Sequence, residues 1–138
     1  MVLLGGPEDA ETAAVVTGKL PGKVFNACGI FSLNRSAAIV KQSNLVITND
    51  TGLMHIAAAF KKKIISLWGN TVPAFGMYPY LPKTNKSESV IFEVSDLACR
   101  PCSKIGFGKC PKKHFDCMKL IDSNQVAEKA NRLMDETD

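Results

Sequence analysis

Residues 45–69, with the sequence LVITNDTGLMHIAAAFKKKIISLWG, have the pattern of a strand, a sharp turn, a helix and a second strand. Residues 45–48 are an apolar run with β-branched members, as expected for a buried strand. Residues 49–52 (Asn-Asp-Thr-Gly) are turn and cap formers, and residues 53–60 combine helical apolar spacing with three alanines. Residues 64–69 are a second apolar run that ends at a glycine. The stretch therefore predicts one βαβ unit.

The turn inside this unit is a candidate ligand site. In open α/β sheets, ligands bind outside the carboxyl ends of the strands. A helix that begins there offers unpaired backbone N–H groups and the positive end of its dipole, and both suit a phosphate group. We therefore expect this turn to hold the phosphate-bearing part of a small ligand.

Four side chains around the turn have predicted roles. Asp50 is placed to cap the helix by accepting from the N–H of Gly52 or Leu53. Thr51 can donate to a phosphate oxygen, and Gly52 lets a bulky anion approach the backbone because it has no Cβ. His55 lies one turn on, on the same face, and can donate to a phosphate or a leaving group. Purely structural roles for Asp50 and His55 remain open.

Small and hydroxylic residues also follow the second strand of the unit. Gly69 and Thr71 lie at its carboxyl end, next to the first turn if the strands pair in parallel. They are candidate contacts to a sugar.

A glycine turn near the start of the chain carries a weaker signal. Residues 5–7 (Gly-Gly-Pro) separate an apolar run from a helical pattern and match no nucleotide-binding fingerprint, which favours a tight turn. The acids that follow, Glu8, Asp9 and Glu11, include a carboxylate that can accept two ribose hydroxyls.

Strand and helix patterns alternate along the whole chain. Apolar runs at residues 1–4, 24–27 and 89–94 add three strands to the two of the central unit. Short connections between alternating elements predict a parallel sheet with helices on both faces. We expect an α/β fold, a Rossmann-like three-layer α/β/α sandwich. A single domain over residues 1–138 is expected, including a cysteine-rich segment at 99–118 and a closing helix at 122–136.

Composition narrows the possible functions. The formal net charge is +4 and 46% of the residues are hydrophobic, as in an ordinary soluble domain. No apolar run approaches the roughly 20 residues of a membrane span. The mild charge comes without a nucleic-acid-binding pattern, so no nucleic-acid partner is expected. The first residues lack the basic region of a signal peptide, which favours the cytoplasm.

Four of the five cysteines lie in residues 99–117, CRPCSKIGFGKCPKKHFDC. Their spacing, C-x2-C-x7-C-x6-C, differs from a plain zinc ribbon, and His114 is an alternative ligand. In the cytoplasm such a cluster suggests zinc before disulfides. Structural zinc, redox-sensitive pairs and free thiols all remain open. Possible metal ligands are Cys99, Cys102, Cys110 and Cys117. The segment is also the most basic part of the chain and can meet phosphates or anionic lipid heads.

The pattern D-T-G-x-x-H-x-x-A-A at residues 50–59, followed by an apolar strand and G-x-T at residues 69–71, resembles glycosyltransferase family 9. These are the ADP-heptose:lipopolysaccharide heptosyltransferases. VLLGGPED at residues 2–9 is similar to the start of the family's C-terminal domain, and the cysteine segment is similar to one in part of the family. The resemblance covers nearly the whole chain but only half of such an enzyme.

The resemblance implies the C-terminal, donor-binding half of a GT-B fold, with the N-terminal half missing. Contacts to the nucleotide-sugar donor, ADP-heptose, would come from Asp50, Thr51, Gly52, His55, Gly69 and Thr71. Asp9 would bind the ribose, and Phe31 would lie at the adenine. The acceptor would be a lipopolysaccharide core at the cytoplasmic face of the inner membrane. No metal would be essential for transfer. The catalytic base would lie in the missing N-terminal domain, so this chain alone would be inactive.

Two alternatives remain, and only the second belongs to another functional class. One is a different GT-B enzyme that uses a nucleotide sugar, and donor specificity separates it from a heptosyltransferase. The other is a non-catalytic zinc or thiol module on a Rossmann-like scaffold, and metal content distinguishes it.

Overall fold

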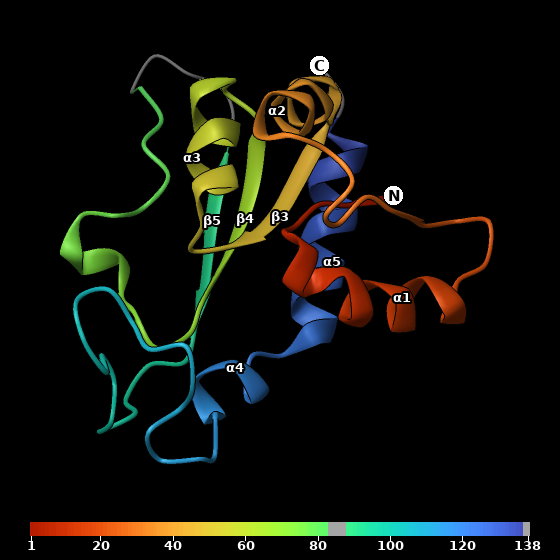
Figure 1. Ribbon diagram of the computed structural model, residues 1–138. Helices are drawn as coiled ribbons and strands as arrows, with labels where there is room; N and C mark the ends of the chain where they lie inside the picture. The colour runs from red at the N-terminus through yellow and green to blue at the C-terminus, as the bar shows by residue number, and fades with distance from the viewer. Residues whose placement is uncertain (83–87, 137–138) are drawn as a thin grey trace. The chain divides into compact units, whose positions relative to one another are not determined.

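The computed structural model describes residues 1–82 and 88–136, and every strand pairing within those residues is parallel. The strands form two sheets, with the orders β1-β2 and β3-β4-β5 (Figure 1). The chain groups into two units, Met1–Ile39 and Val40–Asp138. The predicted α/β class with parallel pairing is confirmed, whereas the single domain over residues 1–138 stays a prediction.

The first unit is a small βαβ arrangement. Its strands β1 (Val2–Leu3) and β2 (Phe25–Asn26) pair in parallel over two residues each. Between them lie a short 3-10 helix η1 (Pro7–Asp9) and α1 (Ala10–Lys19). The predicted strand, glycine turn and helix are therefore present, with strands shorter than the apolar runs that suggested them.

The second unit contains the predicted central βαβ. Strand β3 (Leu45–Asn49) leads through the turn to α3 (Gly52–Ala59), and β4 (Lys63–Trp68) follows. Strand β5 (Ser89–Glu93) pairs with the other edge of β4. The closing helix α5 (Ser123–Asp135) matches the expected helix at 122–136 to within one residue at each end.

The middle strand β4 is covered on both faces. Ile64 and Ile65 are fully buried although neighbouring side chains of a strand point to opposite faces. Helices α3 and α5 both pack against β3 and β4, and Figure 1 shows them on either side of the sheet. This three-layer packing explains why residues 64–68 are apolar almost without alternation.

The remaining elements are short or lie at the boundary of the units. Helix α2 comprises Leu33–Gln42. A 3-10 turn η2 (Pro73–Phe75) follows β4, and α4 (Asp116–Lys119) ends the cysteine segment. Neither η2 nor α4 was predicted, because each is a single turn without a periodic pattern.

The packing of α5 predicts unequal effects of two neighbouring truncations. Leu133 is 1% exposed and Met134 is 46% exposed. Replacing Leu133 with Ala should lower the free energy of unfolding by about 2–5 kcal/mol, because the side chain leaves a cavity. The control Met134→Ala should change it by less than about 0.5 kcal/mol. Urea unfolding followed by Trp68 fluorescence measures both, and equal losses would contradict the described packing.

Candidate functional site

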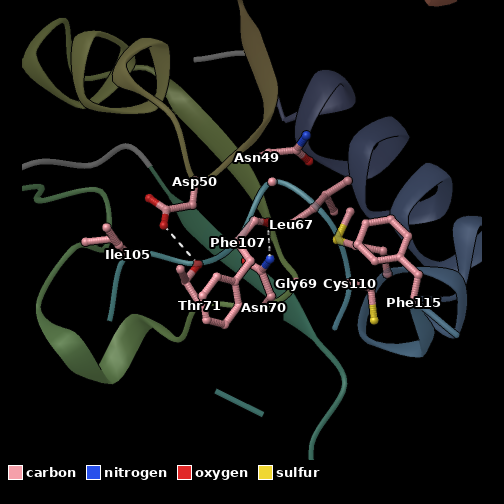
Figure 2. A pocket seen from close by; sticks show the side chains of 12 residues that line it. Asn49, Asp50, Leu67, Gly69, Asn70, Thr71, Ile105, Phe107, Cys110 and Phe115 are labelled. Atoms are coloured by element: carbon pink, nitrogen blue, oxygen red, sulfur yellow. Dashed lines mark hydrogen bonds between the residues drawn. The ribbon is translucent and has the colours of Figure 1, made fainter. Parts of the chain in front are cut away.

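A cleft of about 230 Å³ lies at the carboxyl ends of β3 and β4, within the second unit (Figure 2). One wall comes from the strand ends and the residues after them: Asn49, Asp50, Leu67, Gly69, Asn70 and Thr71. The other wall comes from the cysteine segment and α4: Ile105, Phe107, Gly108, Cys110, Phe115 and Met118. The cleft is therefore polar on the strand side and largely apolar on the other.

Asp50 and Thr71 join the two strand ends across this cleft. The Thr71 hydroxyl donates to Asp50 Oδ2 at 2.9 Å, and Thr71 is buried (Figure 2). The predicted cap was wrong, because no side chain caps α3 and its N-cap residue is Thr51. Asp50 turns toward β4 instead, because Thr71 supplies a donor there. Asp50, Gly69 and Thr71 are thus brought together as expected.

The start of α3 is open. A Cβ added at Gly52 would meet no atom within 4 Å. Thr51, Gly52 and His55 are exposed, whereas Met54 and Ala57 face the core. The three predicted ligand contacts therefore share one exposed face of the helix, although none of them lines the cleft.

The Thr51 hydroxyl already has a partner. Its Oγ1 lies 3.2 Å from Thr48 Oγ1, and the Thr48 hydroxyl donates to the carbonyl of Asn49 at 2.9 Å. The proton between the two threonines therefore belongs to Thr51. To donate to a phosphate, Thr51 must exchange this contact for the ligand.

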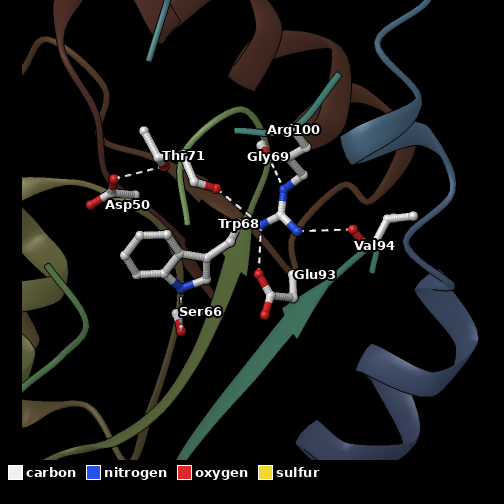
Figure 3. A network of polar contacts seen from close by, with 8 residues as sticks. All are labelled: Asp50, Ser66, Trp68, Gly69, Thr71, Glu93, Val94 and Arg100. Atoms are coloured by element: carbon white, nitrogen blue, oxygen red, sulfur yellow. Dashed lines mark hydrogen bonds and ion pairs between the residues drawn. The ribbon is translucent and has the colours of Figure 1, made fainter. Parts of the chain in front are cut away.

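Arg100 binds the backbone just beyond the carboxyl ends of β4 and β5 (Figure 3). Its guanidinium, in a side chain only 6% exposed, donates to the carbonyls of Gly69 (2.5 Å), Thr71 (3.0 Å) and Val94 (2.8 Å). It also pairs with Glu93 at 2.6 Å. Arg100 was predicted only as part of a basic surface. Its position between Cys99 and Pro101 carries no signal that could have revealed a buried role.

Asp9 and Phe31 belong to the first unit. The Asp9 carboxylate accepts from the Gly6 N–H at 2.9 Å, and a Cβ at Gly5 would lie 2.5 Å from Asp9 Oδ2. Asp9 therefore orders the glycine turn, and its predicted ribose contact stays a prediction. Phe31 is half-buried, and its predicted adenine contact is likewise untested.

Sequence reasoning missed the second wall of the cleft. The cysteine segment docks on the end of β4 through the Cys102 N–H, which donates to the Asn70 carbonyl at 2.9 Å. The Asn70 side chain in turn donates to the carbonyl of Phe107 at 2.7 Å. Gly106 permits this approach, since a Cβ there would lie 2.5 Å from the Asn70 side chain. Only the Asn-Thr pair after β4 hinted at such a contact.

The thiols of the cysteine segment have different environments. Burial raises the pKa of Cys117, and nearby thiolates of Cys102, Cys110 and Cys99 raise it further. Burial alone would raise the pKa of Cys110, but hydrogen bonds from the backbone N–H of Phe115 and of residues 112–114 lower it below its ordinary value. All of these cysteines are free thiols.

The sequence profile of glycosyltransferase family 9 (heptosyltransferase) matches residues 1–106. The chain belongs to glycosyltransferase family 9. The match includes both strand ends of the cleft and Arg100, and it ends inside the cysteine segment.

Curated family 9 proteins similar to this chain are much longer. Lipooligosaccharide heptosyltransferase 2 of Campylobacter jejuni is 32% identical over 112 residues, which are 81% of this chain and 32% of that protein. Lipopolysaccharide heptosyltransferase 2 of Escherichia coli K12 is 29% identical over 79 residues, 54% of this chain and 23% of that protein. The chain thus spans about a third of the length of the first of these relatives.

Solved structures of family 9 proteins share the fold. The glycosyl transferase family 9 structure from Veillonella parvula superposes with a TM-score of 0.70 at 26% identity, over 99% of this chain and 36% of that one. E. coli ADP-heptose lps heptosyltransferase II gives a TM-score of 0.67 at 21% identity, over 96% of this chain and 35% of that one. The predicted resemblance and GT-B-like architecture are confirmed. No described helix is long and apolar enough to cross a bilayer.

The buried position of Arg100 in this family 9 chain predicts a large effect of its removal. Arg100→Met should lower the free energy of unfolding by roughly 2–4 kcal/mol, because three carbonyl oxygens lose their donor. The same change at Arg132, which is 70% exposed and pairs with Glu136 one turn away, should cost less than about 0.5 kcal/mol. Chemical denaturation of the two variants measures the difference, and a similar small loss for both would refute the role of Arg100.

Proposed function

We propose that this chain is the donor-binding part of a lipopolysaccharide heptosyltransferase. In this proposal the open start of α3 holds the diphosphate of ADP-heptose. The cleft beside it, between Asp50, Thr71 and the cysteine segment, receives the sugar. The activity belongs to a longer protein, and the remaining part supplies the acceptor site.

The observation that carries the proposal is the side-chain bond from Thr71 to Asp50. It draws the carboxylate away from α3, so no side chain caps the helix. The first N–H groups of a helix have no partner within it, and they carry the positive end of the dipole. The space in front of Gly52 is clear. An anionic group of the size of a diphosphate is the ligand that satisfies these donors.

The other side chains then have distinct tasks. Thr51 donates to a phosphate oxygen once it leaves Thr48. His55, exposed one turn along α3, donates to the departing diphosphate. Asp50 keeps its second carboxylate oxygen for a sugar hydroxyl, since only Oδ2 is bonded to Thr71. Helix dipole and side-chain donors stabilise the leaving group, and no metal is essential for the transfer.

The residues of the proposed donor site do not bind the acceptor. We infer that the base that activates the acceptor hydroxyl belongs to the part of the protein beyond this chain. The basic residues of the cysteine segment approach the phosphorylated core acceptor at the cytoplasmic face of the membrane. They are Lys104, Lys109, Lys112, Lys113 and Lys119.

Nucleotide titration of the isotopically labelled chain tests the donor site. ADP should shift the backbone amide signals of Thr51, Gly52 and His55 with a dissociation constant in the millimolar range, because the partner domain is missing. UDP carries the same diphosphate on a different base. It should therefore shift these signals less if the site recognises adenine. No shift at these amides at saturating ADP would refute the proposed site, and equal shifts with both would favour a different nucleotide-sugar transferase.

A substitution at Gly52 separates ligand binding from folding. The added Cβ of Gly52→Ala meets no atom of the chain, so the free energy of unfolding should stay level or rise by up to about 1 kcal/mol. The same methyl group stands where the diphosphate approaches, and ADP affinity should fall by about tenfold, or about 1.4 kcal/mol.

The matched control is Gly18→Ala in α1, where an added Cβ also meets no atom and which does not line the cleft. This variant should bind ADP as the parent chain does. Unchanged ADP affinity in Gly52→Ala would show that the backbone at the start of α3 does not contact the nucleotide.

A further inference from the structure

The cysteine segment places an aromatic ring in the wall of the cleft. Phe107 is 51% exposed, although phenylalanine is among the residues most often buried. It lines the cleft together with Ile105, which is 82% exposed (Figure 2). Single exposed apolar side chains are common on protein surfaces, whereas apolar side chains that face a few polar groups across a cleft are typical of a ligand pocket. A ligand in this cleft would therefore cover Phe107.

Hydrogen bonds to the end of β4 hold Phe107 in position. Its carbonyl accepts from the Asn70 side-chain amide at 2.7 Å, and the Cys102 N–H donates to the Asn70 carbonyl at 2.9 Å. In the part of the chain that the structure describes, no three Cys, His, Asp or Glu side chains are grouped as metal ligands, so the predicted zinc site stays a prediction. The loop that carries the ring is tied at both ends, which lowers the entropy lost when a ligand binds.

Gly106 brings this loop close to the polar wall. It has a φ of +76°, and a Cβ there would lie 2.5 Å from Asn70 Oδ1 and 3.1 Å from Thr71 Cγ2. The Ser103 hydroxyl donates to the Gly106 carbonyl at 3.1 Å and closes the turn. Thr71 is the residue that donates to Asp50. Phe107 therefore follows directly after a glycine that packs on the partner of Asp50.

The opposite wall accepts hydrogen bonds. Asp50 uses Oδ2 for the Thr71 hydroxyl, and a carboxylate can accept further donors at its other oxygen. The Asn49 side chain lines the cleft beside it. The cleft of about 230 Å³ thus has acceptors on one side and an aromatic ring on the other.

We propose that Phe107 packs against the transferred sugar in the donor site and thereby sets the affinity for the sugar part of the donor. A sugar ring has hydroxyl groups around its edge and C–H bonds on its faces. The C–H bonds carry partial positive charge, and the face of an aromatic ring is partly negative, so the two attract each other. Asp50 then accepts from the hydroxyls at the opposite edge. The role rests on the proposed donor site and assigns its sugar contact to the cysteine segment.

Paired titrations of the isotopically labelled chain with ADP and with ADP-heptose test this role. The ratio of the two dissociation constants measures what the sugar adds to binding. In the parent chain ADP-heptose should bind about fivefold more tightly than ADP, the size expected of one aromatic contact. Phe107→Ala should lower this ratio to about one and leave ADP affinity unchanged, whereas Phe107→Tyr keeps the ring and should keep the ratio.

The matched control is Phe75→Ala. Phe75 is 42% exposed, belongs to the same unit and does not line the cleft, so both dissociation constants should stay at their parent values. A second measurement needs no variant. Transferred nuclear Overhauser effects should connect the ring protons of Phe107 with carbon-bound protons of the sugar in ADP-heptose.

The outcomes separate the sugar contact from the donor site. A ratio that survives Phe107→Ala, or no Overhauser effect from this ring in a chain that binds ADP-heptose, would overturn the sugar contact and leave the donor site standing. Equal losses of affinity for ADP and ADP-heptose in Phe107→Ala would also overturn it, because the ring would then act on the nucleotide or on the fold. No shift of the Gly52 amide with either ligand would refute the donor site, and the sugar contact with it.

Discussion

The buried guanidinium of Arg100 is the interaction on which the candidate site depends. It holds the carbonyls of Gly69 and Thr71, which are the two ends of the turn after β4. Thr71 is thereby placed to donate to Asp50. Because Asp50 is drawn to Thr71, α3 begins without a side-chain cap. A side chain that binds the backbone just after β4 and β5 thus determines whether the start of α3 can accept an anion.

This arrangement explains why the ligand-binding end is separate from the apolar core. The core residues of β4 alternate between two covered faces, and Ile64, Ile65 and Trp68 are fully buried. Trp68 illustrates the boundary, since it is fully buried and its indole N–H donates to Ser66 Oγ at 3.0 Å. One residue later the backbone carbonyl is already a partner of Arg100. The change from packing to polar chemistry takes place within two residues.

The central βαβ unit could be predicted from sequence because its signals are local. Apolar runs, the Asn-Asp-Thr-Gly turn and the spacing of alanines determine strand, turn and helix within 25 residues. The partner of Asp50 could not be predicted, because Thr71 lies 21 residues away and competes with the helix N–H groups for the same carboxylate. Arg100 was missed for a related reason. A lysine-rich neighbourhood suggests exposure to solvent, and only the tertiary fold shows that this side chain is buried against the carbonyls that follow β4 and β5.

The cysteine segment is the other place where local patterns fail, and the cause is physical. A segment that buries few apolar side chains has no periodicity to read, so its structure depends on long-range bonds. Two of these bonds involve Asn70: its carbonyl accepts from the Cys102 N–H, and its side-chain amide donates to the carbonyl of Phe107. Cys110, Phe115 and Met118 of this segment and α4 form part of one wall of the cleft. The shape of the cleft therefore depends on the long-range contacts that hold the segment on the end of β4.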